Sequence, residues 1–353
     1  MRKIIVDCRF ASSRTGLGTF TRELVSSLLA RSDPWEYILL TRHKDTTFGR
    51  DRTAQQVVFD VPHYSPAEQA LLPLLISKLR ADLFFSPQFN VPFVMPIPFV
   101  CTVHDLILHD FPNAAGILRR TAYRAIFSAA IKRAKHIVVV SQATASALMT
   151  EYPSVRAERI TVVHPGLSPH FSPQTESEQA RVRRSYAIPN PYLLYVGSAK
   201  EHKNIPGLLA EFARLRTHID LVLVTGGREV SQYTLPAGAR VVFPVNDADL
   251  PSIYSGASCF VTASLAEGFG LPIIEALACG CPVVAYALPS FVEATSSCAL
   301  LAENKSGSLA RGIESVLAGV IDRDELAKGW HERFSWKVSA ENIAAIFARE
   351  LHS

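Results

Sequence analysis

Two glutamates flank a glycine turn in the carboxyl-terminal half of the chain. The segment 264–285 reads SLAEGFGLPIIEALACGCPVVA, and its two carboxylates belong to Glu267 and Glu275. Gly268 and Gly270 allow backbone N–H groups to come close to a ligand. A helix is predicted to begin directly after this turn, and the unpaired N–H groups of its first turn would attract an anion. The segment therefore predicts a phosphate site beside two carboxylates.

The two carboxylates are expected to have different roles. Glu275 is predicted in the first turn of the helix, where an ionised carboxylate can accept hydrogen bonds from vicinal hydroxyls such as those of a ribose. Glu267 precedes the turn and would face a second polyol. For each glutamate considered alone, an ordinary structural role is as plausible as a binding role: Glu267 could be a solvated loop residue and Glu275 an ordinary first-turn residue of the helix. The combination with the glycine turn and the flanking strands favours a binding site.

A second glycine turn follows an apolar strand predicted at 192–196. Its sequence, Gly-Ser-Ala-Lys-Glu-His-Lys-Asn, ends at Asn204, and a helix is predicted from 205 to 216. A lysine just ahead of a helix N-terminus can neutralise a diphosphate. Lys203 is therefore the predicted diphosphate ligand, with Ser198 and His202 beside it.

Two features of the first half suggest a second set of ligand contacts. Gly16 and Gly18 lie between a strand predicted at 3–7 and a helix, but Thr21 stands where a dinucleotide-binding motif would have its third glycine. This substitution argues against NAD. His104 follows a strand predicted at 99–103, and the carboxyl ends of parallel strands are where open α/β sheets bind ligands.

Length and composition are those of a two-domain α/β protein. The chain has 353 residues, 48% of them hydrophobic and 19% charged, and a single core rarely extends beyond about 300 residues. We predict domains at 1–170 and 171–334, followed by a helix at 335–353. A net charge of +4 argues against a dedicated nucleic-acid binder. The scattered cysteines, the absence of a long apolar run and the start of the chain directly in a strand predict a cytoplasmic protein.

The E-x7-E spacing in EGFGLPIIE, followed by ALACGCPVVA, resembles the signature of retaining glycosyltransferase family 4. The lead-in DADLPSIYSGASCFVTASLAEGFG and the closing segment FSWKVSAENIAAIFARE resemble the same family. The resemblance implies the GT-B fold, an α/β fold with two Rossmann-like, doubly wound domains facing across a cleft. It also implies an acceptor-binding first domain, a nucleotide-sugar-binding second domain, and a C-terminal helix that crosses back to the first domain.

The resemblance also implies roles for individual residues. The residues that it assigns to catalysis are His104, Glu267 and Lys203. Those that it assigns to the donor are Gly16, Gly18, Ser198, His202, Lys203, Asn246, Glu267, Gly268, Phe269, Gly270, Leu271 and Glu275. The sequence departs from the family at one point, because Ser198 and His202 stand where many members carry an arginine. Charge compensation for the leaving group is therefore expected to be weaker.

The implied activity is that of a retaining, metal-independent hexosyltransferase with no cofactor besides a GDP- or UDP-linked sugar donor. The predicted reaction moves mannose from GDP-mannose to a glycan or lipid-linked acceptor in bacterial surface polysaccharide assembly. Asp247 and Asp249 are interpreted as helix-capping acids and not as a metal motif. The alternatives are a nucleotide-sugar epimerase or hydrolase, a catalytically idle sugar-nucleotide binding protein and, third, an NAD-dependent oxidoreductase.

A basic segment lies between Phe111 and Thr150, where the sequence has no acidic residue. On a helical projection Arg120, Arg124, Lys132 and Lys135 fall within an arc of about 120°, which Ile117 and Ile131 interrupt. Arg119 and Arg133 lie in the same segment. One hypothesis is a peripheral contact with anionic lipid at the inner face of the plasma membrane. The alternative is an ordinary solvated helix.

Overall fold

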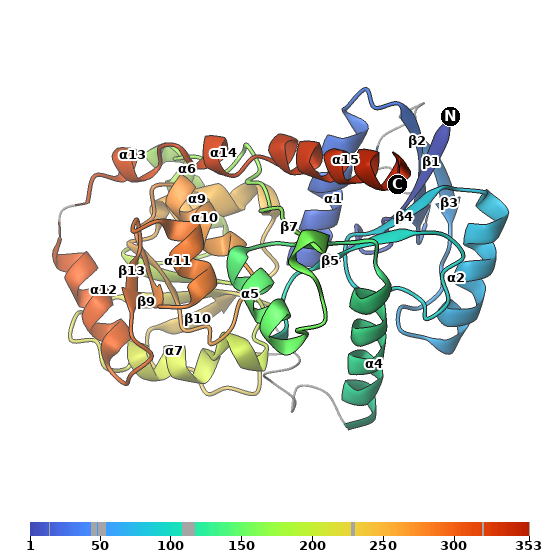
Figure 1. Cartoon of the computed structure of the whole chain (residues 1–353). Helices are drawn as coiled ribbons and strands as arrows, with labels where there is room; N and C mark the ends of the chain where they lie inside the picture. Colours follow the sequence, from blue (N-terminus) through green and yellow to red (C-terminus); the bar gives the residue numbers. More distant parts are fainter. Residues whose placement is uncertain are drawn as a thin grey trace. The chain divides into compact units, whose positions relative to one another are not determined.

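The computed structural model describes the chain except for residues 14, 44–47, 49–53, 108–116, 227–229, 320 and 353, and except for the side chains of 117–120. It divides into two compact units (Figure 1). Unit 1 comprises Met1–Gly166 and Phe334–Ser353, and unit 2 comprises Leu167–Arg333. Residues 167–170, assigned to the first domain from the sequence, therefore lie in unit 2.

Unit 1 contains a seven-stranded parallel sheet with the strand order β3-β2-β1-β4-β5-β6-β7. Its strands are β1 (Arg2–Asp7), β2 (Trp35–Thr41), β3 (Ala54–Val58), β4 (Leu83–Ser86), β5 (Phe99–Val103), β6 (His136–Val139) and β7 (Ile160–Val162). The central strands are buried along their whole length because helices cover both faces of the sheet.

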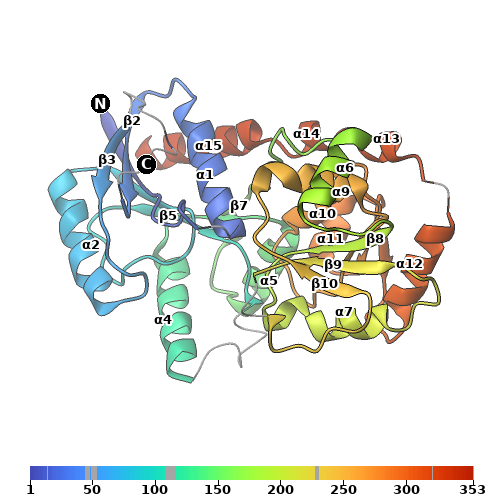
Figure 2. The ribbon, with the colours of Figure 1, turned by 180° about the vertical axis from the view of Figure 1, so that it is seen from behind.

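Helices form a layer on each face of this sheet. One core joins the sheet to the helices α2 (Pro66–Leu79), α4 (Ile117–Arg133) and α5 (Gln142–Glu151). The helices α1 (Gly16–Leu29) and α15 (Trp336–His352) pack against each other (Figure 2). Successive residues of β4 pack against opposite helix layers. Phe84 belongs to the core shared with α2, α4 and α5, and Phe85 contacts Phe347 of α15.

Helix α15 belongs to unit 1 although it follows unit 2 in the sequence. Its aromatic residues hold it there, because the Trp336 ring lies 5.7 Å from that of Phe20 and the Phe347 ring lies 6.3 Å from that of Trp35. The backbone also fits closely, and a Cβ atom at Gly166 would lie only 2.2 Å from the amide nitrogen of Trp336. The C-terminal segment thus completes the core of the first unit.

Unit 2 contains a six-stranded parallel sheet with the order β10-β9-β8-β11-β12-β13. Its strands are β8 (Tyr192–Val196), β9 (Asp220–Val224), β10 (Ala239–Val242), β11 (Cys259–Thr262), β12 (Val283–Tyr286) and β13 (Leu300–Ala302). Its helices are α6 (Glu176–Ser185), α7 (Ile205–Phe212), α9 (Leu250–Gly256), α10 (Leu271–Ala278), α11 (Pro289–Thr295), α12 (Ser308–Ala318), α13 (Arg323–Leu326) and α14 (Trp330–Arg333).

Both sheets have the strand order of doubly wound Rossmann domains. The α/β prediction with two Rossmann-like domains is therefore confirmed. In each sheet successive strands are added first toward one edge and then toward the other. The change occurs between β1 and β4 in unit 1 and between β8 and β11 in unit 2. Within the described part of the chain, no helix combines the length and the apolar character needed to cross a bilayer.

A buried carboxylate anchors helix α12 in unit 2. Glu211 of α7 is 3% exposed, and its two oxygens accept hydrogen bonds from the N–H groups of Gly307 at 2.6 Å and Ala310 at 3.0 Å. These N–H groups belong to the first turn of α12, which has no side-chain cap of its own. Glu211 of α7 therefore caps the N-terminus of the neighbouring helix α12.

We expect Glu211→Ala to lower the free energy of unfolding by about 2–4 kcal/mol, because two N–H groups lose their acceptors in the protein interior. Urea denaturation provides the measurement. The matched control is Glu314→Ala, which removes a partly exposed carboxylate that accepts one backbone hydrogen bond from Arg216 at 2.9 Å. Equal losses in the two variants would show that Glu211 does not anchor α12.

Candidate functional site

The candidate site of unit 2 lies at the carboxyl ends of β8 and β11. These strands are neighbours at the point where the strand order reverses, so the loops that follow them diverge and leave a crevice. The loop after β8 carries residues 197–204, and the loop after β11 carries residues 263–270. The two glycine turns that the sequence singled out are thus brought to the same edge of the sheet.

Hydrogen bonds lock these two loops together. The N–H of Leu265 donates to the carbonyl oxygen of His202 at 2.8 Å. The side chain of Asn204 donates to the carbonyl oxygen of Ala263 at 3.2 Å and accepts from the N–H of Gly207, which caps α7. Asn204 adopts a left-handed conformation (φ 52°), which asparagine tolerates better than most residues. Asn204 is not among the residues predicted for the site, although an asparagine just before Ile-Pro is a typical start of a helix.

Lys203 and Glu267 form an ion pair across the two loops. The Nζ of Lys203 lies 2.5 Å from the Oε1 of Glu267, and their side chains are 16% and 13% exposed. Ser264 donates a hydrogen bond from its hydroxyl to the same Oε1 at 2.9 Å. Ser264 was not selected from the sequence, which gave no signal for it beyond its place in the loop. The pair places an ammonium and a carboxylate side by side at the edge of the crevice.

The glycine turn after β11 leads directly into helix α10. Gly270 is the N-cap residue with φ 101°, and a Cβ atom there would lie 2.6 Å from the ring of Phe291. Only glycine therefore fits at this position. The cap has no side-chain hydrogen bond. Pro272 has no N–H and the N–H of Ile273 donates to the carbonyl oxygen of Gly270 at 3.0 Å, so the Leu271 N–H is the donor that the first three positions of α10 leave for a ligand. Leu271 and Pro272 form the first helical positions.

Glu275 occupies a different environment from the one predicted. It is the fifth residue of α10, and the first turn of this helix contains no acid, so the expectation of a first-turn carboxylate was wrong. The hydroxyl of Tyr254 donates to its Oε2 at 2.9 Å. Burial raises the pKa of Glu275 to about 7, against the effect of the Tyr254 hydrogen bond, and Asp247 adds a smaller upward shift. The prediction failed because the helix begins one turn before Glu275.

The other predicted residues of unit 2 lie in the same loops or near them. Ser198 accepts a hydrogen bond from the hydroxyl of Tyr195 through its carbonyl at 2.6 Å. Gly268 precedes Phe269, which is 4% exposed and thus contributes its backbone more than its ring. The Asn246 side chain accepts from the N–H of Ala248, and the Asn246 N–H donates to Tyr186. Asn246 therefore already has partners at the end of the β10 loop.

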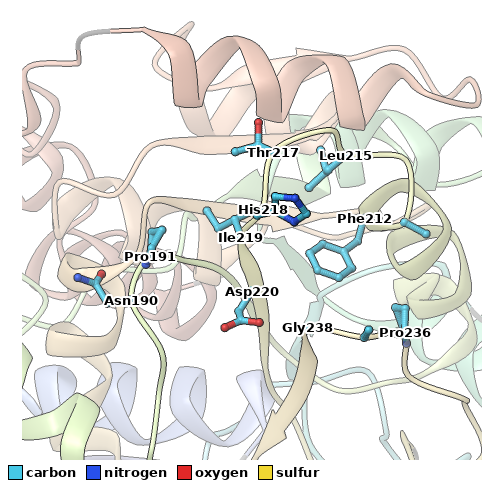
Figure 3. Close-up of a pocket in the computed structure, with 12 residues that line it drawn as sticks. Asn190, Pro191, Phe212, Leu215, Thr217, His218, Ile219, Asp220, Pro236 and Gly238 are labelled. Atoms are coloured by element: carbon cyan, nitrogen blue, oxygen red, sulfur yellow. The ribbon is translucent and has the colours of Figure 1, made fainter.

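Unit 2 has a small pocket at the candidate site and a larger hollow elsewhere. Lys203, Glu267 and Gly270 line a small pocket together with residues of β8, β11 and α10. A hollow of about 480 Å³ lies at the opposite edge of the sheet, where Asp220 begins β9 and Gly238 precedes β10. Figure 3 shows this hollow. None of the residues predicted for chemistry lines it, so size alone does not identify the functional site.

In unit 1 the predicted residues gather at the carboxyl ends of β1 and β5. Gly16 begins α1, and Gly18 is packed so closely that a Cβ atom would lie 1.9 Å from the carbonyl oxygen of Ser13. Phe20, two residues further along α1, contacts His104 edge to face with ring centroids 4.6 Å apart. The structure thus brings His104 and the glycine loop of α1 together, as members of one unit.

His104 is neutral and has a defined orientation. Its Nε2 lies 2.7 Å from the carbonyl oxygen of Pro87, which requires the proton on Nε2 and leaves Nδ1 as a hydrogen-bond acceptor. Burial lowers the pKa of His104 to about 4, although the Pro87 hydrogen bond opposes the shift. The ring can therefore accept a hydrogen bond from a hydroxyl at neutral pH, but it does not supply a positive charge.

A buried ionic network that the sequence did not reveal lies beside this group. Arg9 donates to Asp7 at 2.6 Å and to Glu68 at 2.6 Å, and all three side chains are at most 1% exposed. Asn90 donates to both oxygens of Glu68. Burial would raise the pKa values of Asp7 and Glu68, but Arg9 and the hydrogen-bond donors around them hold both below their usual range. The network fixes the segments that follow β1 and β4.

Among the residues that the structure describes, no three histidine, cysteine, aspartate or glutamate side chains converge as metal ligands would. Asp247 and Asp249 lie in a short 3-10 helix ahead of α9, and Asp249 pairs with Arg181 of α6 at 2.8 Å. Asp249 stands at the N-cap position of α9, but its side chain makes no capping hydrogen bond there, and the side chain of Asn246 caps the 3-10 helix instead.

We expect the raised pKa of Glu275 to make unit 2 less stable as the pH rises from about 4.5 to about 7, because the folded state then retains a proton that the unfolded state releases. Glu275→Gln keeps the shape without the charge. At about pH 8 it should raise the free energy of unfolding by about 2 kcal/mol, less than the full shift implies because Glu275 is partly exposed.

The comparison of wild type and Glu275→Gln in urea at about pH 5 and about pH 8 measures this effect. The two proteins should differ little at the lower pH, where both side chains are uncharged in the folded state. A variant that is no more stable than wild type at the higher pH would contradict the assigned environment of Glu275.

Two family models match the chain. The model described as Glycosyltransferase Family 4 matches residues 14–171, and the model described as Glycosyl transferases group 1 matches residues 178–332. The two matches nearly follow the division into units. The first begins in unit 1 and ends five residues into unit 2, and the second lies within unit 2. Together they include the glycine loop of α1, His104, and both loops of the candidate site.

Curated relatives and solved structures agree with these matches. The chain is 30% identical over 236 residues to O-antigen chain mannosyltransferase B of Escherichia coli, which is 63% of this chain and 61% of the relative. It resembles the structure of sucrose-phosphate synthase from Thermosynechococcus elongatus with a TM-score of 0.77 and 20% identity, covering 99% of both chains.

A further similar structure is Anabaena HepE in complex with UDP-glucose, with a TM-score of 0.76 and 17% identity, covering 99% of this chain and 100% of that one. At such identities the structural likeness concerns the fold, which is that of GT-B proteins. The aligned region spans less than two thirds of the curated relative named above. The two matching family models, the E-x7-E segment and the paired Rossmann-like units together show that the chain belongs to glycosyltransferase family 4.

Proposed function

We propose that the protein transfers a hexose from a nucleotide-sugar donor to a glycan or lipid-linked acceptor. The observation that carries this proposal is the Lys203–Glu267 ion pair, which stands between two glycine loops at the reversal point of the unit 2 sheet. A cation, a carboxylate and the N-terminus of α10 meet there. These are the groups that a nucleotide-sugar requires, because it carries phosphates at one end and hydroxyls at the other.

The donor is assigned to unit 2 by the charges of its loops. Lys203 and the Leu271 N–H at the start of α10 would bind the diphosphate. Glu267 would exchange part of its contact with Lys203 for hydroxyls of the sugar. Glu275, with Tyr254 as its neighbour, would accept hydrogen bonds from the ribose hydroxyls, and such hydrogen bonds favour the ionised carboxylate. Donor binding is thus expected to lower the pKa of Glu275.

The proposed reaction breaks the bond between the anomeric carbon and the diphosphate oxygen, and the oxygen of the acceptor hydroxyl forms the new bond to that carbon while its proton passes to the departing diphosphate. Negative charge develops on the departing diphosphate, where Lys203 and preorganised N–H donors stabilise it. The family resemblance implies retention of configuration. Because we assign no residue as a covalent nucleophile, we propose that the acceptor attacks from the same face as the departing diphosphate, within an ion pair. We also propose that the reaction is metal-independent, with Lys203 and backbone N–H groups in the role of the cation.

Unit 1 is assigned to the acceptor. Its sheet carries His104 and the glycine loop of α1 at the carboxyl edge, as open α/β sheets do with their ligand groups. The Nδ1 of His104 is a hydrogen-bond acceptor for a hydroxyl group, and Pro87 holds the ring in place. The Asp7–Arg9–Glu68 network keeps the neighbouring segments rigid without presenting net positive charge.

Mannose from GDP-mannose is our proposal for the donor, and surface polysaccharide is our proposal for the product. The support is the 30% identity to a relative named O-antigen chain mannosyltransferase B. The structure of Anabaena HepE in complex with UDP-glucose shows that a protein of this fold also binds a uridine donor. The two nucleotides therefore form the natural comparison in an experiment.

We expect Lys203→Ala to reduce kcat/KM by about 10²–10³-fold, because the diphosphate loses its preorganised cation. The assay follows transfer of labelled mannose from GDP-mannose to lipid-linked glycans extracted from bacterial membranes. Lys305→Ala is the matched control, since Lys305 is 73% exposed and pairs only locally with Glu303. Donor consumption without a sugar-bearing product would favour a hydrolase or epimerase, and donor binding without turnover would favour a binding protein.

Thermal-shift measurements with GDP-mannose and UDP-glucose test the donor. A ligand at about 100 times its dissociation constant adds about 2.7 kcal/mol of stability. GDP-mannose should give the larger shift, and Lys203→Ala should abolish most of it. A larger shift with UDP-glucose would replace the guanosine donor by a uridine donor and leave the proposed transfer reaction in place.

A further inference from the structure

Buried polar atoms without a hydrogen-bond partner gather at the carboxyl edge of the unit 1 sheet. Within the described part of the chain they include His63 Nε2 in the segment between β3 and α2, and Gln88 Nε2 and Asn90 Oδ1 in the segment after β4. Gln88 and Asn90 are 4% and 0% exposed, and the His63 side chain is 7% exposed. The hydroxyl oxygens of Ser86 in β4 and Thr102 in β5 also lack a partner. Because an unpartnered buried polar atom is destabilising, several of them at one edge indicate a site that a polar ligand completes.

These atoms lie beside the point where the direction of strand addition changes. The strands β1 and β4 are neighbours there, and the segment after β4 carries Gln88 and Asn90. The segment after β1 carries Phe10, whose ring stacks on that of His63 with centroids 3.7 Å apart. Open α/β sheets bind ligands in the crevice at such a point. The unpartnered atoms are therefore where a ligand of unit 1 is expected.

Tyr64 contacts Gln88 from an unusual backbone conformation. Its φ angle is 61°, in the left-handed region that a bulky residue rarely adopts, and its N–H donates to Glu68 Oε2 at 2.6 Å. Strain of this kind is commonly maintained at ligand sites. Tyr64 is 45% exposed, and its hydroxyl donates to Gln88 Oε1 at 3.3 Å. A hydrogen bond of this length is weak, so a ligand hydroxyl could replace it.

The buried side chain of Glu68 connects three residues of this site. Its oxygens accept hydrogen bonds from the N–H of Tyr64 and from the side-chain amide of Asn90 at 3.0 and 2.9 Å. His63 Nδ1 lies 3.3 Å from Glu68 Oε1, which favours the neutral tautomer with the proton on Nδ1 and leaves Nε2 to accept a hydrogen bond. We call His63, Tyr64, Gln88 and Asn90 the polar cluster.

Carboxylates outnumber cations among the described charged side chains that act on the polar cluster. Asp7 and Glu68 share the single guanidinium of Arg9, and all three side chains are buried. Burial, together with the carboxylates of Glu68 and Asp105, raises the pKa of Tyr64 above its usual range, so Asp105 also acts on the polar cluster. An anionic ligand would therefore be repelled here.

A further cation, Arg22 of α1, contacts the loop after β1. Its guanidinium donates to the carbonyl oxygens of Ala11 and Ser13 at 2.6 and 2.8 Å, and to the hydroxyl of Thr19 at 3.2 Å. Its donors are thus directed to the loop itself. Arg22 therefore does not supply the anion site that the polar cluster lacks.

An uncharged sugar ring fits the groups of the polar cluster. A sugar has an apolar face of C–H groups, for which Tyr64 and the neighbouring ring of Phe89, with centroids 6.2 Å apart, provide aromatic surface. Its hydroxyls both donate and accept hydrogen bonds, which are the partners that Gln88 Nε2, Asn90 Oδ1 and His63 Nε2 lack. The chemistry of the polar cluster thus matches neutral hydroxyls better than a phosphate.

We propose that the polar cluster binds the terminal sugar of the acceptor, and that the carboxylates around it exclude an acceptor whose reacting end is a phosphate. This inference rests on the proposed transfer reaction and narrows its acceptor to an uncharged sugar end. The sugar displaces the Tyr64 hydroxyl from Gln88 and becomes the partner of its amide. The polar cluster adjoins His104, whose Nε2 donates to the carbonyl oxygen of Pro87, the residue before Gln88.

Transfer kinetics of the full chain with two acceptors test the charge selection. The labelled donor is the nucleotide-sugar that gives the larger thermal shift. Wild type should transfer its sugar to lipid-linked glycans extracted from bacterial membranes, and should be at least about tenfold less active on undecaprenyl phosphate, which presents only a phosphate. Equal transfer to the two acceptors would overturn the proposal.

Variants of the polar cluster test its residues. Gln88→Ala and Tyr64→Ala should each raise KM for the lipid-linked glycans about five- to tenfold and leave KM for the donor within about twofold of wild type. Tyr64→Phe should retain the wild-type KM for the acceptor, because the ring remains and the sugar displaces the hydroxyl. Gln55→Ala is the matched control, since Gln55 is an exposed glutamine of β3 in the same unit.

The donor-induced thermal shift reports the fold of each variant, and it should equal that of wild type because the donor is assigned to unit 2. An unchanged acceptor KM in both Gln88→Ala and Tyr64→Ala would overturn the assigned subsite and leave the proposed transfer reaction in place. Absence of transfer by wild type to either acceptor would instead overturn the proposed function, and this inference with it.

Discussion

The parallel order of the unit 2 strands is the constraint on which the candidate site depends. Because the order reverses between β8 and β11, the loops after these two strands emerge side by side although they are about 65 residues apart in sequence. Two contacts then lock them: the Leu265 N–H on the carbonyl of His202, and the Asn204 side chain on the carbonyl of Ala263. The ion pair of Lys203 and Glu267 needs this rigidity, because a flexible pair of side chains would lose entropy when it formed.

The carboxylates of the protein illustrate how environment decides function. Glu68 and Glu211 are buried and fully engaged, one with Arg9 and Asn90 and the other with the N–H groups of α12. Glu267 is partly exposed and contacts Lys203, whose ammonium group could also bind a phosphate. Glu275 lies between these cases, since burial raises its pKa to about 7 while Tyr254 supplies one hydrogen bond. A group in this position gains most from a ligand that donates hydrogen bonds.

The two units differ in the chemical groups at the carboxyl edges of their sheets. Unit 2 offers an ammonium, carboxylates and a helix N-terminus, which suit a charged, hydroxyl-bearing ligand. Unit 1 offers the neutral imidazole of His104 and a network whose charges are already paired.

Local sequence determined the features that depend on neighbouring residues: the strands, the glycine turns, the helix that follows the second of these turns at Leu271 and the assignment to glycosyltransferase family 4. It also placed Lys203 just ahead of α7. Tertiary structure alone decided which side chains meet. The pairing of Lys203 with Glu267, the bond from Tyr254 to Glu275 and the capping of α12 by Glu211 all join distant segments. The environment of Glu275 was also not predicted. Its burial depends on packing from α9 and on the residue at which α10 begins, and the spacing of residues along the chain determines neither.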